Sequence, residues 1–273
     1  MNALKSWRQW TLVVLSVYFC SAAARSQEPA HKPTLFIVGD STVKNGTRSQ
    51  RGWGEEIAAF FDADRIKIEN RAIGGRSSRT FINEGRWDKI LAEAKSGDYV
   101  LVQMGHNDGG PLDDPARARG SLRGIGEETK EIDNPLTKQH EVVHTYGWYL
   151  RKYINDAKAK GMIPIICSPV PHCPQAPVQP GDVEKSNYVL WSSQVAENEH
   201  VPFIHLNKII MSHYVGLTPQ QIKSKYFTAA DNTHTSREGA LLNASSVVEG
   251  IRELKDLPLA KYLAPRPATV PAQ

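Results

Sequence analysis

The sequence predicts an α/β fold, a three-layer α/β/α sandwich in which a doubly wound parallel sheet lies between two layers of helices. The run Thr34 to Val38 is too short for a helix and rich in β-branched and aromatic residues, so a buried central strand is expected there. Strand-like and helix-like segments then alternate five times along the chain. The first four strands each end in a polar loop containing Gly or Pro, and such loops meet at one edge of a parallel sheet.

The remaining elements follow from the same patterns, taken in order. Residues 55–61 are amphipathic and predict a helix, whereas residues 66–73 alternate apolar and polar side chains, as a second strand does. Thr235 and Glu238 fit a capping box at the start of the last helix. Further strands are expected at 99–104, 163–167 and 203–206, and further helices at 86–94, 148–159, 182–198, 208–215, 219–225 and 235–253.

One segment breaks this alternation. Residues 109–143 are rich in Gly, Pro and charged side chains and show no steady period, which predicts a long loop. A loop of this length inside a compact domain is usually functional. The length of the chain suits one domain, at 32–256. The Pro- and Ala-rich residues 257–273 are expected to form a poorly ordered tail.

The N-terminus has the layout of a secretory signal peptide. Lys5 and Arg8 precede an uncharged stretch from Thr11 to Cys20, and small residues follow. This layout predicts that residues 1–24 are cleaved off and that the protein is secreted or periplasmic. The apolar part has about ten residues, too few to span a bilayer, although an N-terminal membrane anchor is an alternative. A lipid anchor at Cys20 is a second alternative, which the bulky residue before it disfavours.

Charge and cysteine content narrow the set of partners. The chain has 33 Lys and Arg against 29 Asp and Glu, and the expected cleavage removes two basic residues and no acidic one, which leaves a net charge of about +2. Such a charge gives no electrostatic case for nucleic acid or a membrane as partner. Export would permit a disulfide between Cys167 and Cys173, and whether it forms is left open. Two cysteines without a paired motif do not predict a structural zinc site.

Ser41 is the candidate nucleophile. It comes just after the first strand, at the edge where parallel sheets bind ligands, and Gly39 permits a sharp turn there. A serine hydroxyl is a poor nucleophile unless a base accepts its proton, and a third group must hold that base in one tautomer. Asp231 and His234 can supply both, because an acid three residues before a histidine can meet it across one turn of backbone. Taken alone, His234 could equally be a surface or capping histidine.

Attack on an ester carbonyl also creates a negatively charged oxygen, which preorganised hydrogen-bond donors must stabilise. The candidate donors are the backbone N–H groups of Ser41 and Gly75 and the side-chain amide of Asn107, which follow the first, second and third strands. Taken alone, Gly75 and Asn107 could be ordinary turn residues. Their placement with Asp231 and His234 at one sheet edge is more specific than any one of them.

Four short motifs carry a family resemblance: Gly39-Asp40-Ser41, Gly75, Gly105-His106-Asn107-Asp108 and Asp231-x-x-His234. Together they resemble the four blocks of the SGNH (GDSL-type) hydrolase superfamily and span most of the mature chain. Three longer runs, at 70–81, 105–110 and 231–236, are similar to rhamnogalacturonan acetylesterases and their bacterial relatives.

The resemblance implies a flavodoxin-like, five-stranded parallel sheet of order 2-1-3-4-5. It implies that Ser41 is the nucleophile, that His234 is the base and that Asp231 orients the base. It also implies an oxyanion hole formed by Ser41, Gly75 and Asn107, and neither a metal nor another cofactor. Residues 109–143 depart from the family pattern because they are longer than expected, and loops there would shape the substrate groove.

The favoured function is that of a secreted serine esterase, which removes acetyl groups from a plant cell-wall polysaccharide of the rhamnogalacturonan or pectin type through an acyl-enzyme. The expected partner is an acetylated polysaccharide or oligosaccharide, with no nucleic acid, and no membrane after signal cleavage; the oligomeric state is left open. A lipase- or thioesterase-type acyl hydrolase is an alternative, although the loops around the motifs are polar. A non-catalytic carbohydrate-binding protein is another. Nucleotide binding at residues 74–78 is disfavoured, because the spacing fits neither phosphate-loop fingerprint.

Three further side chains are candidates for contact with a sugar, each with a plainer alternative. Arg76 and Arg79 could bind an acidic sugar or only pair with nearby carboxylates. Trp53 could stack on a sugar ring or pack in the core. Asp40 and Asp108 are expected to brace their loops rather than react.

Overall fold

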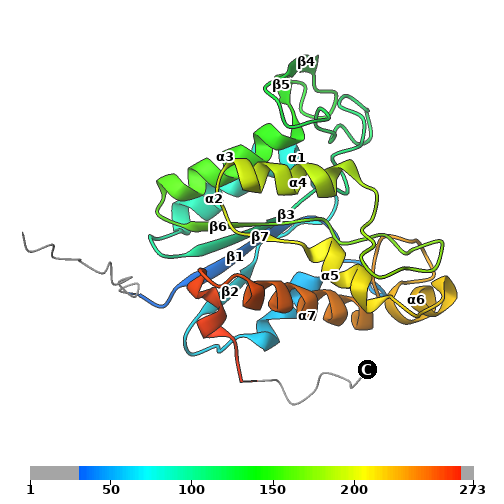
Figure 1. Cartoon of the computed structure of the whole chain (residues 1–273). Coiled ribbons are helices and arrows are strands. Elements are labelled where there is room, and N and C mark those ends of the chain that lie inside the picture. Colours follow the sequence, from blue (N-terminus) through cyan, green and yellow to red (C-terminus); the bar gives the residue numbers. More distant parts are fainter. Residues whose placement is uncertain (1–30, 266–273) are drawn as a thin grey trace, which may run out of the picture.

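The computed structural model describes residues 31–265, so the expected signal peptide at 1–24 and the lipid-anchor alternative at Cys20 lie outside the described residues. Its centre is a five-stranded sheet in which all neighbouring strands are parallel (Figure 1). The strands run in the order β2-β1-β3-β6-β7, and their bounds are β1 Thr34–Gly39, β2 Lys67–Asn70, β3 Tyr99–Gln103, β6 Ile163–Cys167 and β7 Phe203–Ile204. Since β4 and β5 form a separate hairpin, this is the expected order 2-1-3-4-5, and the predicted fold class is confirmed.

Helices cover both faces of the sheet (Figure 1). One layer contains α1 Ser78–Asn83, α2 Arg86–Glu93, α3 Tyr146–Ala159 and α4 Asn187–Asn198. The other contains α5 Leu206–His213, α6 Pro219–Tyr226, α7 Arg237–Glu253 and the 3-10 helices η1 Trp53–Glu55, η2 Ile57–Phe60 and η3 Pro258–Tyr262.

The alternation of side chains along β1 explains both layers. Leu35 and Ile37 pack into the core formed with α5 and α7. Phe36 and Val38 pack into the core formed with α2, α3 and α4. Successive residues of a strand face opposite sides of the sheet, and all four of these side chains are at most 3% exposed. A strand that is apolar on both faces is therefore buried on both faces, as expected for a parallel sheet.

The helix expected at 55–61 is instead the pair of short 3-10 helices η1 and η2. Both ends of this segment are bonded elsewhere. The N–H groups of Trp53 and Gly54 donate to carbonyls of the loop after β1, at 3.1 and 2.9 Å, and Phe61 forms a bridge with Leu263. These contacts hold both ends of the segment to other parts of the chain.

The capping box expected at Thr235 and Glu238 is also wrong. Ser236 is the N-cap of α7, and its hydroxyl accepts a hydrogen bond from the N–H of Gly239. The hydroxyl of Thr235 donates instead to the carbonyl of Arg51 at 2.8 Å. Because Thr235 is held in this bridge between distant segments, the helix begins one position later than the motif suggests.

Two further differences concern the other helical layer. α4 begins at Asn187 rather than at residue 182, because the Asp182 carboxylate accepts from the N–H of Gln179 within the preceding loop. α1 was not expected, and it begins where the Ser77 hydroxyl accepts a hydrogen bond from the N–H of Thr80.

An antiparallel hairpin lies at 129–144, almost wholly within the segment 109–143 for which the sequence predicts only a loop. Its strands are β4 Thr129–Asp133 and β5 His140–His144, and the hairpin projects from the body of the molecule beyond α1 and α3 (Figure 1). Only Ile132 and Val143 of these strands are buried. With so few apolar residues, the strands carry no alternating pattern that the sequence could reveal.

The expected tail is ordered at its start. Leu257, Leu259 and Tyr262 are buried on the core, the last two within η3. The prediction of a poorly ordered segment is therefore wrong for residues 257–265, because the apolar side chains between the Pro and Ala residues pack on the core. Residues 266–273 lie outside the described residues.

Within residues 31–265, no helix is both long and apolar enough to cross a bilayer. Cys167 and Cys173 are buried free thiols.

Candidate active site

Ser41 lies in a tight turn directly after β1. A Cβ atom at Gly39 would lie 2.3 Å from Val43 Cγ2, so only glycine fits where the chain leaves the strand. The carboxylate of Asp40 accepts hydrogen bonds from the N–H and the hydroxyl of Thr42, both at 2.8 Å. The Asp40 carbonyl accepts from the N–H groups of Val43 and Lys44 at 3.1 Å. These bonds fix the turn that carries Ser41.

His234 and Asp231 meet Ser41 from the loop before α7. Nε2 of His234 lies 2.8 Å from Ser41 Oγ, and Nδ1 lies 2.8 Å from Asp231 Oδ2. The other oxygen of Asp231 accepts from the N–H groups of Thr233 and His234 at 2.8 and 2.7 Å. Gln50 donates to Oδ2 at 3.1 Å. The structure thus brings the three residues of the expected triad into one hydrogen-bonded chain.

The charge of Asp231 sets the tautomer of the imidazole. Burial raises the pKa of Asp231, but hydrogen bonds from the ring and N–H of His234 and from the N–H of Thr233 outweigh it and lower the pKa to about 2. An ionised carboxylate only accepts hydrogen bonds, so the proton of the neutral ring lies on Nδ1. Nε2 is then left as an acceptor that faces the hydroxyl of Ser41.

The loop that carries this pair is bonded to three neighbouring segments. The N–H of Cys173 donates to the carbonyl of Asn232 at 2.7 Å, and Lys223 Nζ donates to the side chain of Asn232 at 2.9 Å. The N–H of Arg51 donates to the carbonyl of Thr235 at 2.9 Å. The imidazole is therefore positioned by α6 and two loops as well as by Asp231.

The three expected oxyanion donors surround the same space. Ser41, Gly75 and Asn107 line a cavity of about 760 Å³, together with His234. A Cβ atom at Gly74 would lie 3.5 Å from Ser41 Cβ, so the Gly74–Gly75 turn packs against the nucleophile. Gly75 adopts φ +80°, a backbone conformation that favours glycine.

Each of these donors has an N–H hydrogen available for a ligand. Within the described residues, the N–H groups of Ser41 and Gly75 have no hydrogen-bond acceptor. The amide nitrogen of Asn107 donates one hydrogen to the carbonyl of Arg76 at 2.8 Å, which leaves its second hydrogen available. A developing negative charge in the cavity could therefore receive hydrogen bonds from all three groups.

Asp40 and Asp108 brace the loops behind the cavity, as expected. Both carboxylates are fully buried. Asp40 lies 3.2 Å from Nδ1 of His106, whose Nε2 lies 3.0 Å from the carbonyl of Val170. Burial opposes both charges, but their mutual attraction and hydrogen bond prevail, so the pKa of Asp40 is lowered and that of His106 is raised. Burial raises the pKa of Asp108 to about 6, although hydrogen bonds from Ser78 and Ser121 act against it.

The hydrogen-bonded floor below Ser41 continues through the core. The indole N–H of Trp53 donates to Oε1 of Gln103 at 2.8 Å. Nε2 of Gln103 donates to the hydroxyl of Thr42 at 2.8 Å, and that hydroxyl donates to Asp40. With the contacts from Asp40 to His106 and from His106 to the Val170 carbonyl, one chain of hydrogen bonds runs under the nucleophile from η1 to the loop after β6.

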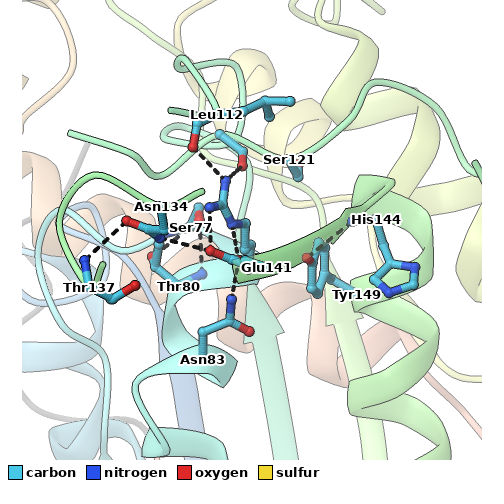
Figure 2. A network of polar contacts seen from close by, with 12 residues as sticks. Ser77, Thr80, Asn83, Leu112, Ser121, Asn134, Thr137, Glu141, His144 and Tyr149 are labelled. Atoms are coloured by element: carbon cyan, nitrogen blue, oxygen red, sulfur yellow. Dashed lines mark hydrogen bonds and ion pairs between the residues drawn. The ribbon is translucent and has the colours of Figure 1, made fainter. Parts of the chain in front are cut away.

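Two of the three candidate sugar contacts are wrong. Trp53 is 0% exposed, because its ring packs in the core and its N–H bonds to Gln103. Arg79 is also 0% exposed and donates to both oxygens of Glu141, at 2.6 and 2.7 Å, in a network that Figure 2 shows around Glu141. Neither side chain can reach a substrate. Arg76 does line the cavity, where it pairs with Glu84, and its contact with a sugar stays a prediction.

Two arginines in the cavity wall were not expected from the sequence. Arg117 and Arg119 belong to the inserted segment 109–143 and line the same cavity as Ser41. Their signal in the sequence is the alternation Ala116-Arg117-Ala118-Arg119, in which small residues leave long basic side chains free to extend. Within residues 31–265, no group of three His, Cys, Asp or Glu side chains is placed to hold a metal ion.

The chain is similar to proteins of known family. The chain matches the GDSL-like Lipase/Acylhydrolase family over residues 37–242. It is 30% identical to the probable rhamnogalacturonan acetylesterase YesY of Bacillus subtilis over 84% of this chain and 96% of that protein. It is 31% identical to the rhamnogalacturonan acetylesterase of Emericella nidulans over 80% of this chain and 84% of that protein.

Solved structures share the fold. The crystal structure of the Bacillus subtilis protein YxiM superposes with a TM-score of 0.65 and 24% identity; the match covers 82% of this chain but 57% of YxiM. Axe2, an acetylxylan esterase from Geobacillus stearothermophilus, superposes with a TM-score of 0.52 and 19% identity, over 80% of this chain and 94% of Axe2.

Proposed function

The chain belongs to the GDSL-like Lipase/Acylhydrolase family and is a carboxylic ester hydrolase, and we propose that it is a serine esterase that removes acetyl groups from a plant cell-wall polysaccharide of the rhamnogalacturonan or pectin type. The observation that carries the proposal is the continuous contact from Asp231 through His234 to Ser41, with 2.8 Å at both steps. A serine so placed can lose its proton as it attacks.

The proposed reaction has two halves. Ser41 Oγ attacks the acetyl carbonyl while its proton passes to Nε2 of His234, and Asp231 stabilises the imidazolium that forms. The negatively charged oxygen receives hydrogen bonds from the N–H groups of Ser41 and Gly75 and from the amide of Asn107. The carbon–oxygen bond to the sugar then breaks, and His234 returns the proton to the leaving sugar hydroxyl.

The second half restores the enzyme. A water molecule gives a proton to His234 and attacks the acetyl group on Ser41, which forms a second tetrahedral intermediate in the same oxyanion hole. Its collapse releases acetate, and the proton on His234 returns to Ser41 Oγ. Each turnover consumes one water and yields one acetate, one proton and one free sugar hydroxyl.

The character of the cavity favours a carbohydrate over a long acyl chain. Most of the residues that line it are polar or charged, and Leu136 is the large apolar residue among them. A lipid chain would require an extended apolar pocket, whereas sugar hydroxyls require hydrogen-bond partners. The names of the curated relatives agree with a carbohydrate substrate.

Acetate release from acetylated pectin, rhamnogalacturonan and xylan tests the proposal. Wild-type enzyme should release acetate, and Ser41→Ala and His234→Ala should each abolish release. Ser49→Ala is the matched control, since Ser49 is exposed on the neighbouring loop. Full activity in either triad variant would refute the mechanism. A preference for p-nitrophenyl esters of eight carbons or more over the acetate ester would favour the acyl-hydrolase alternative.

We also propose that the enzyme acts outside the cytoplasm, with the sequence of residues 1–24 as the support. The N-terminal sequence of the protein recovered from the secreted or periplasmic fraction tests this, and it should begin near Arg25. Recovery of the intact N-terminus in the cytoplasm alone would overturn it.

A further inference from the structure

Two guanidinium groups enter the cavity of Ser41 from the inserted segment. Arg119 is half-buried, and its Nη1 donates to the carbonyl of Gly75 at 3.1 Å. Arg117 is exposed and lines the same cavity. Within residues 31–265, neither side chain has a carboxylate partner, whereas Arg76, the residue after Gly75, pairs with Glu84.

Three acids near Arg117 and Arg119 are bonded to other groups and form no ion pair with either arginine. Asp40 is bonded to His106 and Thr42, and Asp108 is bonded to Ser78 and Ser121; both are 0% exposed. Glu84 pairs with Arg76 and Arg86. Burial and the positive charge of Arg117 lower the pKa of Arg119, and the more distant charges of Asp40 and Asp108 offset this only in part, as expected for a guanidinium withdrawn from water without a paired anion. An anionic ligand would remove this electrostatic cost.

The inserted segment holds Arg119 in place rather than leaving it on a free loop. One nitrogen of the buried Arg79 donates to the carbonyls of Leu112 and Gly120, at 3.0 and 2.7 Å. Its other two nitrogens, Nε and Nη2, donate to the carboxylate of Glu141 on β5. Glu141 also accepts a hydrogen bond from Asn134 at 2.8 Å (Figure 2). Arg79 thus clamps both ends of the stretch that contains Arg119 to the hairpin.

The backbone beside Arg119 is closely packed as well. A Cβ atom at Gly120 would lie 1.8 Å from the carbonyl oxygen of Gly110, and the N–H of Gly120 donates to the carbonyl of Pro111 at 2.9 Å. The N–H of Ser121 donates to the carbonyl of Asp108, one residue after Asn107, at 3.0 Å. The insertion is therefore bonded directly to the loop that carries an oxyanion donor, and a preorganised cation lies beside the reacting centre.

We propose that Arg119, with Arg117 beside it, forms an anion subsite that binds the carboxylate of a uronic acid in the acetylated polysaccharide. This rests on the proposed function, and it names the sugar chemistry that the site prefers. A guanidinium presents paired N–H donors that match the two oxygens of a carboxylate. The residues that line the cavity include three arginines, Arg76, Arg117 and Arg119, and one acidic residue, Glu84. The cavity wall is therefore complementary in charge to a polyanionic glycan.

The distance from the oxyanion hole to the guanidinium of Arg119 is comparable with the size of one sugar. Gly75 offers its N–H to the acetyl oxygen and its carbonyl to Arg119, so the guanidinium lies within one residue length plus one hydrogen bond of the oxyanion hole, about 7 Å at most. That span is comparable with a single pyranose ring. The carboxylate would therefore belong to the acetylated sugar itself or to the next sugar of the chain.

The test compares two polymers with the same acetyl content: acetylated polygalacturonic acid, and the same material with its carboxylates methyl-esterified. Wild-type enzyme should have the higher kcat/KM on the free acid, and the preference should shrink at high salt. Arg119→Gln should lower kcat/KM on the free acid by roughly tenfold or more, mainly through KM, because a charge-assisted hydrogen bond is lost. The loss on the methyl ester should be much smaller, so that the preference ratio approaches one.

Matched variants separate binding from structure. Arg117→Gln should reduce the same ratio by less, and Arg119→Lys should keep part of it because it keeps the charge. Arg48→Gln removes an exposed arginine outside the cavity and should leave the ratio unchanged. If Arg119→Gln does not fold, as thermal unfolding would report, then Arg119→Lys and Arg117→Gln decide the question.

Equal wild-type rates on the two polymers would overturn the subsite while leaving the esterase intact. An equal loss on both polymers in Arg119→Gln would also overturn it, since Arg119 would then act only by supporting Gly75. Failure of the proposed function would look different: no acetate would be released from any acetylated carbohydrate.

Discussion

Nε2 of His234 lies 2.8 Å from Oγ of Ser41, although the two residues are 193 positions apart in the chain. The parallel sheet accounts for this meeting. β1 delivers Ser41 to the carboxyl edge of the sheet, and α7 returns along one face with the loop of His234 at its start. The catalytic contact is thus a product of topology, and the hydrogen bonds of Asp231 then refine its geometry.

Asp231→Asn should preserve the fold and lower kcat by roughly 10²- to 10⁴-fold. The amide has nearly the shape of the carboxylate but no charge to stabilise the imidazolium, and its NH₂ group can turn the ring into the wrong tautomer. Steady-state acetate release measures the effect, with KM expected to change little. The control Asp88→Asn alters an exposed aspartate of α2 and should retain wild-type rates. Activity of Asp231→Asn within threefold of wild type would contradict the assigned role.

Asn107→Ala should lower kcat by roughly 10²- to 10³-fold while KM changes little, because the lost donor acts on charge that develops during reaction. Asn107 also supports the carbonyl of Arg76, so a parallel rise in KM would indicate a disturbed cavity instead. Asn198→Ala, at the exposed end of α4, serves as the control.

Asp108 should make stability fall as the pH rises from about 4 to about 7. Burial raises its pKa to about 6 from an ordinary value of 3.8, so between these values the folded state binds more protons than the unfolded state. Linkage then lowers the free energy of unfolding with rising pH, by an amount on the order of 3 kcal/mol for this group. Urea unfolding of wild type and Asp108→Asn across this range measures the difference.

In that experiment the difference in unfolding free energy between Asp108→Asn and wild type should shift in favour of the variant at higher pH. Asp256→Asn, on the surface, should follow the wild-type curve. A difference that stays constant from pH 4 to 7 would show that Asp108 is not the titrating group.

Arg79→Met should lower the free energy of unfolding by about 3–5 kcal/mol. The substitution removes the guanidinium that donates to Glu141 and to the carbonyls of Leu112 and Gly120, and it leaves the charge of Glu141 without its cation. Chemical denaturation measures the loss. Arg86→Met removes a partly exposed pair with Glu84 and should cost at most about 1 kcal/mol. Similar losses in the two variants would show that the clamp is no stronger than a surface ion pair.

Parallel strands end at the same edge of a sheet, and this explains how much of the site could be predicted from the sequence. Ser41, Gly75 and Asn107 each follow a recognisable strand, and parallel strands bring such positions together, so their convergence was predictable from residues alone. The order of the strands came from the family resemblance. By contrast, nothing local distinguishes Arg79 from Arg76, yet the first is fully buried and the second lines the cavity.

The errors share a physical cause. Trp53, Arg79 and Thr235 are bonded to partners far away in the chain, and a sequence window contains no information on such partners. The hairpin β4–β5 was missed for a related reason, since its few buried residues leave no period to detect. The place of Arg119 in the cavity was not predicted, because it depends on the contact between the insertion and Gly75.

The chain of hydrogen bonds from Trp53 to the Val170 carbonyl has a practical consequence for redesign. Every polar atom in that series already has a hydrogen-bond partner. Replacing one residue of the series would therefore leave a buried polar atom of its neighbour without a partner. The wall contributed by residues 109–143 can be exchanged as a cassette instead. A different segment in place of residues 109–143 would change the glycans that the cavity accepts and leave Ser41, Asp231 and His234 in place, if the bonds from Ser121 to Asp108 are kept.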